Sequence, residues 1–92
     1  MRYQRVDWHH DLEDEPVVLF SEIGSDNHER RKVDQYRDGR LDFADNERAT
    51  GSTLLGDQEV PPLEAINADP EFTAEAIDAA AFERVWKLAI GG

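Results

Sequence analysis

Three histidines and a nearby aspartate are the residues whose types come closest to a catalytic or metal-binding set, because imidazole and carboxylate groups are common metal ligands. They are His9, His10, Asp11 and His28. Val6 and Trp8 alternate with charged residues, which predicts a strand over 2–10, and neighbouring residues of a strand point to opposite faces. His9 and His10 therefore cannot readily bind one ion together. We predict no metal site and no cofactor, and interpret the histidines as surface or partly buried side chains at a strand end.

Catalytic motifs are missing from the chain. The sequence has no Gly-x-Ser-x-Gly elbow, no phosphate-binding glycine loop, no His-Glu-x-x-His pair and no cysteine. With 21 Asp and Glu residues, pairs of carboxylates will meet by chance, so their presence does not identify a general acid and base. We predict a protein that is not an enzyme and has no catalytic residues.

The charge of the chain is strongly negative, with 21 acidic against 10 basic residues and a formal net charge of −11. Such a surplus repels nucleic acid and anionic membranes and attracts cationic partners. We predict a basic protein partner, with no direct binding of nucleic acid or membranes. The residues predicted to meet it are Asp11, Glu13, Asp14, Glu15, Asp57 and Glu59. For the run from Asp11 to Glu15, a solvated turn is the alternative interpretation.

The length of 92 residues corresponds to one domain, here residues 1–92. Without cysteine the chain has neither disulfides nor thiolate metal ligands, which suits a reducing compartment. The N-terminus lacks the apolar core of a signal peptide, and no apolar run approaches the ~20 residues of a membrane span. We expect a cytoplasmic protein.

Further strands are indicated by alternation and by turn residues. The run 17–23 is apolar enough for burial on both faces, which predicts a central strand. The polar run 29–36 predicts an edge or solvent-exposed strand, in which Arg31 and its basic neighbours form cross-strand ion pairs. Asp38-Gly39 predicts a type I′ hairpin turn into a strand that begins near Leu41. The segment 53–55 is either a short fifth strand or a crossing to the helical side.

The last third of the chain carries helix signals. Pro61 to Ile66 and Asp69 to Phe72 each predict a single helical turn entered through proline. From Asp78 an apolar stripe at helical spacing predicts a helix that covers a sheet and ends at the glycine pair 91–92. The fold class is therefore α+β, with an antiparallel sheet of about four to five strands in meander order, packed against a C-terminal helix with short helical turns before it.

Several short motifs occur in a distinctive order along almost the whole chain. They are Arg2-Tyr3, Val6-x-Trp8-x-His10, Asp14-Glu15-Pro16, Arg31-Lys32-Val33, Arg37-Asp38-Gly39, Pro61-Pro62-Leu63, Asp69-Pro70-Glu71-Phe72 and Phe82-Glu83-x-x-Trp86. In this order the chain resembles a family of small bacterial domains of unknown function. The resemblance implies a compact stand-alone domain and transfers no catalytic residue.

Three classes of function follow. The leading hypothesis is a non-enzymatic protein-binding module, such as an immunity- or antitoxin-like inhibitor of a basic protein; an acidic nucleic-acid mimic that acts on a DNA-binding or defence protein would use the same charge. The second class is a small ligand-binding domain or enzyme, with a site near Trp8, His10 and Tyr36. The third is a protein whose acidity only confers solubility.

Overall fold

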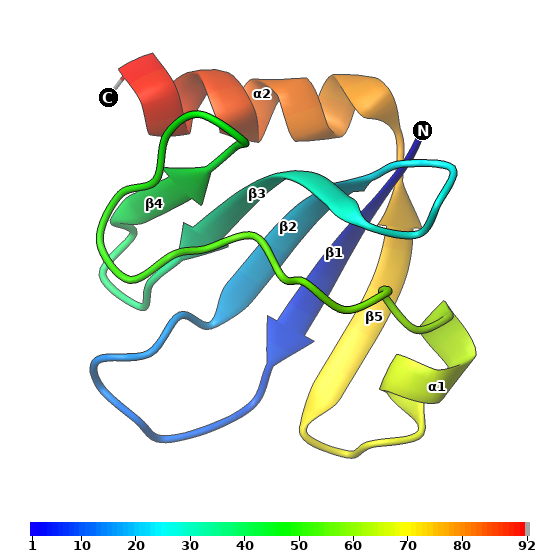
Figure 1. Cartoon of the computed structure of the whole chain (residues 1–92). Helices are drawn as coiled ribbons and strands as arrows, with labels where there is room; N and C mark the ends of the chain where they lie inside the picture. The colour runs from blue at the N-terminus through cyan, green and yellow to red at the C-terminus, as the bar shows by residue number, and fades with distance from the viewer. Residues whose placement is uncertain (92) are drawn as a thin grey trace.

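The computed structural model describes residues 1–91 and consists of one five-stranded sheet and two helices (Figure 1). The elements are β1 (Arg2–Trp8), β2 (Val18–Ile23), β3 (Glu29–Gln35), β4 (Leu41–Ala44), α1 (Leu63–Asn67), β5 (Phe72–Ile77) and α2 (Ala79–Gly91). This is the predicted α+β fold. None of the helices formed by residues 1–91 has the length and apolarity needed to span a bilayer.

The strand order is β4-β3-β2-β1-β5, and all neighbours are antiparallel. The first four strands form the predicted meander, and β5 adds to the free side of β1. β2 is the central strand, as its apolar run predicts. The prediction that 29–36 forms an edge or solvent-exposed strand is wrong, because β3 lies between β2 and β4, and its residues Val33 and Asp34 are buried.

The hairpin between β3 and β4 turns where Asp38-Gly39 predicts it, but with a different geometry. The Gly39 N–H donates to the Tyr36 carbonyl at 2.9 Å, and Gly39 has φ +90°, whereas Asp38 does not have a positive φ. The type I′ prediction is therefore wrong. A turn over Arg37 and Asp38 followed by a left-handed glycine matches the three-residue hairpin loop that ends in a bulge.

The second predicted helical turn, Asp69 to Phe72, is instead the turn that leads into β5. The Asp69 carboxylate accepts the Glu71 N–H at 2.9 Å, and the Asp69 carbonyl accepts the Phe72 N–H at 3.0 Å. Aspartate often forms such local bonds, which compete with a helix. The fifth strand is thus β5, and the segment 53–55 forms no strand; it belongs to the long connection 45–62, which we call the strap.

The main core lies between α2 and one face of the sheet. Asp78 begins the helix as predicted, because its carboxylate accepts the Ala81 N–H at 2.8 Å. The helix extends to Gly91, and Gly92 lies outside the described residues. Phe82 and Trp86 pack there, with Val85 and Ala89 beside them. The buried cluster consists of Val18, Phe20, Val33, Phe43, Phe82 and Trp86.

Candidate functional site

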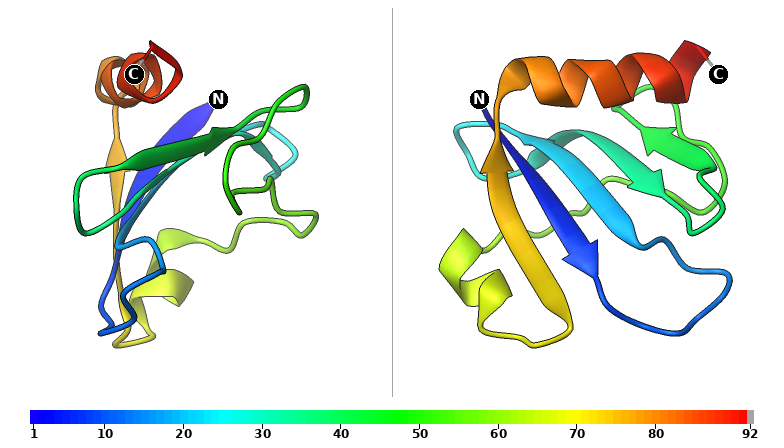
Figure 2. Two further views of the ribbon diagram at one scale, coloured as in Figure 1. Left: turned by 90° about the vertical axis from the view of Figure 1, so that its left-hand side faces the viewer. Right: turned by 180° about the vertical axis from the view of Figure 1, so that it is seen from behind.

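The second face of the sheet, opposite α2, is covered only in part. Because side chains alternate along a strand, Gln4 and Val6 of β1 point to this face, together with their neighbours Ser21 and Leu19 on β2. The strap crosses this face and leads to α1 beside β5 (Figures 1 and 2). The space between the sheet, the strap and α1 is therefore bounded by residues far apart in the sequence.

Hydrogen bonds hold the strap against the sheet and against the turn between β2 and β3. The Thr53 hydroxyl donates to the Asp34 carboxylate at 2.7 Å, and the Gly56 N–H donates to Glu29 at 2.7 Å. Further along, the Val60 N–H donates to the carbonyl of Asn27 at 2.8 Å. These bonds fix the height of the strap above the strands.

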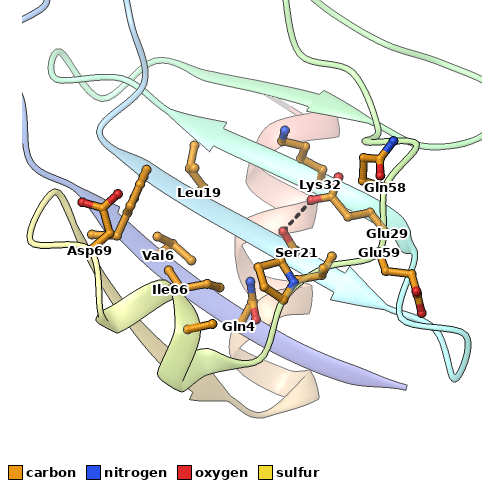
Figure 3. A pocket seen from close by; sticks show the side chains of 14 residues that line it. Gln4, Val6, Leu19, Ser21, Glu29, Lys32, Gln58, Glu59, Ile66 and Asp69 are labelled. Atoms are coloured by element: carbon orange, nitrogen blue, oxygen red, sulfur yellow. Dashed lines mark hydrogen bonds between the residues drawn. The ribbon is translucent and has the colours of Figure 1, made fainter.

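The space between strap and sheet is a groove of about 440 Å³ (Figure 3). Val6 and Leu19 form its apolar floor, and Val60, Ile66 and Phe72 form its apolar sides. The size lies within the range of sites that accept a small molecule or a large side chain. We call this space, with its lining residues, the groove.

Polar side chains stand at one end and along the rim of the groove. Figure 3 shows the Ser21 hydroxyl bonded to Glu29, at 3.0 Å. Lys32 lies beside them and donates to the carbonyl of Leu54 at 3.3 Å. The rim also carries the carboxylates of Glu59 and Asp69. Three carboxylates and one ammonium therefore line the groove, which makes its environment anionic.

Phe72, which lines the groove, belongs to an aromatic pair. Phe72 stacks with Trp8 at a centroid distance of 6.2 Å, and Trp8 contacts the ring of His10 at 4.3 Å. The Trp8 indole N–H is buried and has no hydrogen-bond partner among residues 1–91. Tyr36, which the sequence analysis groups with Trp8 and His10, lies under the guanidinium of Arg40 at 4.2 Å.

The side chains of His9 and His10 make contacts within the fold. His10 Nδ1 accepts the Leu12 N–H at 2.9 Å, and Nε2 lies 2.8 Å from the Pro16 carbonyl, so these bonds assign the Nε2–H tautomer. His9 Nε2 lies 2.7 Å from the Thr73 hydroxyl. Within residues 1–91 no three His, Asp or Glu side chains are placed to hold a metal ion.

The six residues predicted to meet a partner lie on two separate loops. Glu59 lines the groove, and Asp57 lies two residues before it on the strap. The other four, Asp11, Glu13, Asp14 and Glu15, are exposed in the loop between β1 and β2. A cation reaches that loop, because Arg37 donates to the His10 carbonyl at 2.9 Å. Of the six residues, only Glu59 therefore lines the groove.

Both edges of the sheet are partly occupied by the chain itself. On β5 the side-chain amide of Asn67 donates to the Ala74 carbonyl at 2.9 Å and accepts the Ala74 N–H at 2.6 Å. On β4 the Thr50 hydroxyl accepts the Phe43 N–H, and the Thr50 N–H donates to the Phe43 carbonyl, both at 2.9 Å. These contacts take up backbone groups that an added strand would need.

The largest ionic network lies on the helix side, away from the groove. Arg31 pairs across the strands with Glu22 at 2.7 Å, as predicted for the basic run, and it also bonds Glu83 of α2. Its guanidinium stacks over Phe82 and Trp86, 5.0 Å from each ring centre. The hydrogen bonds from Arg31 lower the pKa of both Glu22 and Glu83. This network joins α2 to the sheet.

Asp34 is a buried carboxylate beneath the strap, and we expect Asp34→Asn to stabilise the fold at pH 7. The residue is 5% exposed, one of its oxygens has no partner among the described residues, and burial raises its pKa. The neutral amide can still accept the hydrogen bond from the Thr53 hydroxyl and costs less to bury than a carboxylate. The free energy of unfolding should therefore rise by an amount on the order of 1 kcal/mol.

The gain should depend on pH. A raised pKa means that the stability contributed by protonated Asp34 is fully present below about pH 3.9 and is lost as the pH rises through the folded-state value. Urea unfolding of Asp34→Asn should therefore show the gain at pH 7 and almost none at pH 3. An equal gain at both values, or one shared by the exposed Asp38→Asn control, would contradict this assignment.

The sequence analysis missed most of the residues that line the groove. Gln4, Leu19 and Ser21 alternate with core residues, so the prediction that 17–23 is buried on both faces already indicates that something covers this second face. The cover itself could not be assigned, because the strap has no periodic pattern and is held by single hydrogen bonds to residues distant in sequence.

Comparisons with known proteins identify the chain by family. No curated protein and no solved structure matches it. The model of a family described as a domain of unknown function (DUF6881) matches residues 2–91, in agreement with the resemblance of its ordered motifs to such a family. Since the match covers all but the two terminal residues, the chain belongs to the DUF6881 family of domains of unknown function.

Proposed function

We propose that this domain is a non-enzymatic protein-binding module whose groove receives an apolar side chain of a basic partner protein. The observation that carries the proposal is the combination of an apolar floor and sides with an acidic rim in one groove. Apolar side chains that fill such pockets dominate the affinity of many protein interfaces. The rim adds selectivity for basic residues beside the inserted side chain.

The charge of the chain supports a basic partner. Glu29, Glu59 and Asp69 outnumber Lys32 at the groove, and the whole chain has a net charge of −11. A field of this sign accelerates the approach of a cationic protein and weakens as salt is added. An inhibitor of a basic toxin is the narrower form of this proposal. The apolar centre of the groove favours it over a nucleic-acid mimic, which needs charge along a continuous row.

The rest of the sheet supports insertion of a side chain over addition of a strand. Asn67 and Thr50 occupy backbone groups on the two edges, and α2 covers the other face. A partner strand would first have to displace these contacts, whereas the groove needs no rearrangement to accept a side chain.

A small-molecule site is the second candidate, since the volume of about 440 Å³ alone would suit a drug-sized ligand. A thermal-shift screen of small apolar compounds separates the two candidates. A compound that stabilises the protein and that no peptide displaces would favour this second function.

The proposal can be tested by selecting binders from a displayed library of random 12-residue peptides at low salt. We expect enriched peptides with one apolar side chain flanked by Lys or Arg. The affinity of the selected peptide should fall at least tenfold in Ala65→Trp, which fills the groove from α1. It should stay unchanged in Ala80→Trp, a matched change at an exposed position of α2. Failure to enrich such peptides, or equal binding by Ala65→Trp, would refute the proposal.

Charge variants test the rim. Glu59→Gln with Asp69→Asn removes two charges from the groove, and Asp11→Asn with Glu13→Gln removes the same charge from the loop between β1 and β2. We expect the first pair to lower the peptide affinity several-fold and the second to have a much smaller effect. The reverse order would place the partner on the loop and count against the groove.

A further inference from the structure

Gln4 is a polar residue in the floor of the groove whose side chain has no hydrogen-bond partner within the described residues 1–91. It lies in the middle of β1, where it is the register partner of Ser21 on β2 and of Ala76 on β5. It is 5% exposed, and Figure 3 shows its amide within the groove, between Ile66 and Ser21. Among residues 1–91 no hydrogen bond involves its side chain, whereas the amide of Asn67 makes two.

The neighbours of Gln4 leave its amide oxygen without a donor, because the one proton of the Ser21 hydroxyl is already donated to Glu29. The Ser21 hydroxyl donates to one oxygen of Glu29, and the other oxygen accepts the Gly56 N–H. Val6 and Leu19 beside it are apolar. Water in the open groove can solvate the Gln4 amide, but a side chain that fills the groove would displace this water and leave the amide unpaired, which would lower the affinity by about tenfold.

The chemistry of the amide indicates what must replace that water. A carboxamide presents a donor and an acceptor side by side, and a peptide group presents the complementary pair. The carboxylates of the rim cannot form this pair of bonds, because they accept hydrogen bonds but have no proton to donate.

We propose that Gln4 hydrogen-bonds a backbone peptide group of the segment that enters the groove, so that the groove selects peptides over purely hydrocarbon ligands. This inference rests on the proposed function and deepens it. The occupant is a short segment of a basic protein that inserts one apolar side chain and brings an adjacent peptide group to the floor. Sites built to pair a polar group reject ligands that lack it, because their own polar group is then left unpaired.

The test uses the peptide selected against the wild-type protein. Gln4→Leu and Gln4→Met preserve the approximate volume and remove the amide. We expect about a tenfold loss of affinity in both, while the urea midpoint stays the same or rises, because an unpaired polar group has been removed from a mostly buried position. Unchanged affinity in folded variants would overturn the inference.

A second measurement begins with the wild-type protein, so its first readout does not depend on any variant. Peptides carrying a single backbone N-methyl group at each position in turn should include one that binds wild-type protein at least fivefold more weakly. That position should show little or no loss with Gln4→Met, because the two changes remove the same hydrogen bond. A scan with no sensitive position refutes the role of Gln4 alone, whereas the absence of any peptide that binds wild-type protein refutes the proposed function.

Discussion

Trp86→Ala is expected to lower the free energy of unfolding by about 3–5 kcal/mol, the range for truncating a buried aromatic side chain. Trp86 is 7% exposed, and it packs edge-on against Phe43 at 5.4 Å and beside Phe82 at 6.3 Å. A domain of this size has about 5–15 kcal/mol of stability in total, so the loss is a large share. Urea unfolding followed by far-ultraviolet circular dichroism measures it without relying on the lost indole.

Leu88 provides the control for this variant, because it lies on the same helix and is 66% exposed. Leu88→Ala should change the stability by no more than about 0.5 kcal/mol. A cost below about 1 kcal/mol for Trp86→Ala, or similar costs for both variants, would show that α2 does not pack on the sheet as described.

Arg31→Met is expected to cost about 2–4 kcal/mol, somewhat less than for a fully buried ion pair because Glu83 remains partly exposed. The methionine retains contact with Phe82 and Trp86, but the carboxylate of Glu22, whose side chain is 10% exposed, loses the charge that balances it. The double variant Arg31→Met with Glu22→Gln should recover part of the loss, since no uncompensated charge remains beneath the helix.

The cost of Arg31→Met should also shrink in acid. The pKa values of Glu22 and Glu83 are lowered by Arg31, so the stability that these groups contribute is present above about pH 4.3, the unfolded value, and is lost as the pH falls through the folded values. Urea midpoints of wild type and variant should therefore converge from pH 7 to pH 3. A difference that stays constant would mean that Arg31 acts by packing alone.

The sequence predicts the elements whose patterns are local. The run 17–23 indicates the central strand, and the stripe of Phe82 and Trp86 indicates the helix that covers it. β5 is missed because Asp69-Pro70 is typical of a helix start and the strand itself contains two alanines and a glutamate. Pairing with β1 over its whole length outweighs these weak preferences, which no local pattern reveals.

The candidate site, like the fold, is predicted from the sequence only in part. Surplus negative charge is visible in the composition and leads to Glu59 on the rim. The apolar floor is not visible, because Val6 and Leu19 are indistinguishable from core residues until the strap is seen to leave space above them. The prediction of an edge position for 29–36 is wrong for a related reason. The polar residues of β3 find partners on both faces of the sheet, in Glu22 on the helix side and in the strap on the other side.

The most direct test of the central claim is to locate the selected peptide on the protein by amide chemical shifts in a two-dimensional NMR titration. We predict that the largest changes occur in the middle of β1 and β2, in residues 58–61 of the strap and in α1, with a coincident change in the fluorescence of Trp8 in a Trp86→Phe background. Changes confined to the loop 11–15 or to the outer side of α2, with the groove residues unaffected, would contradict the account.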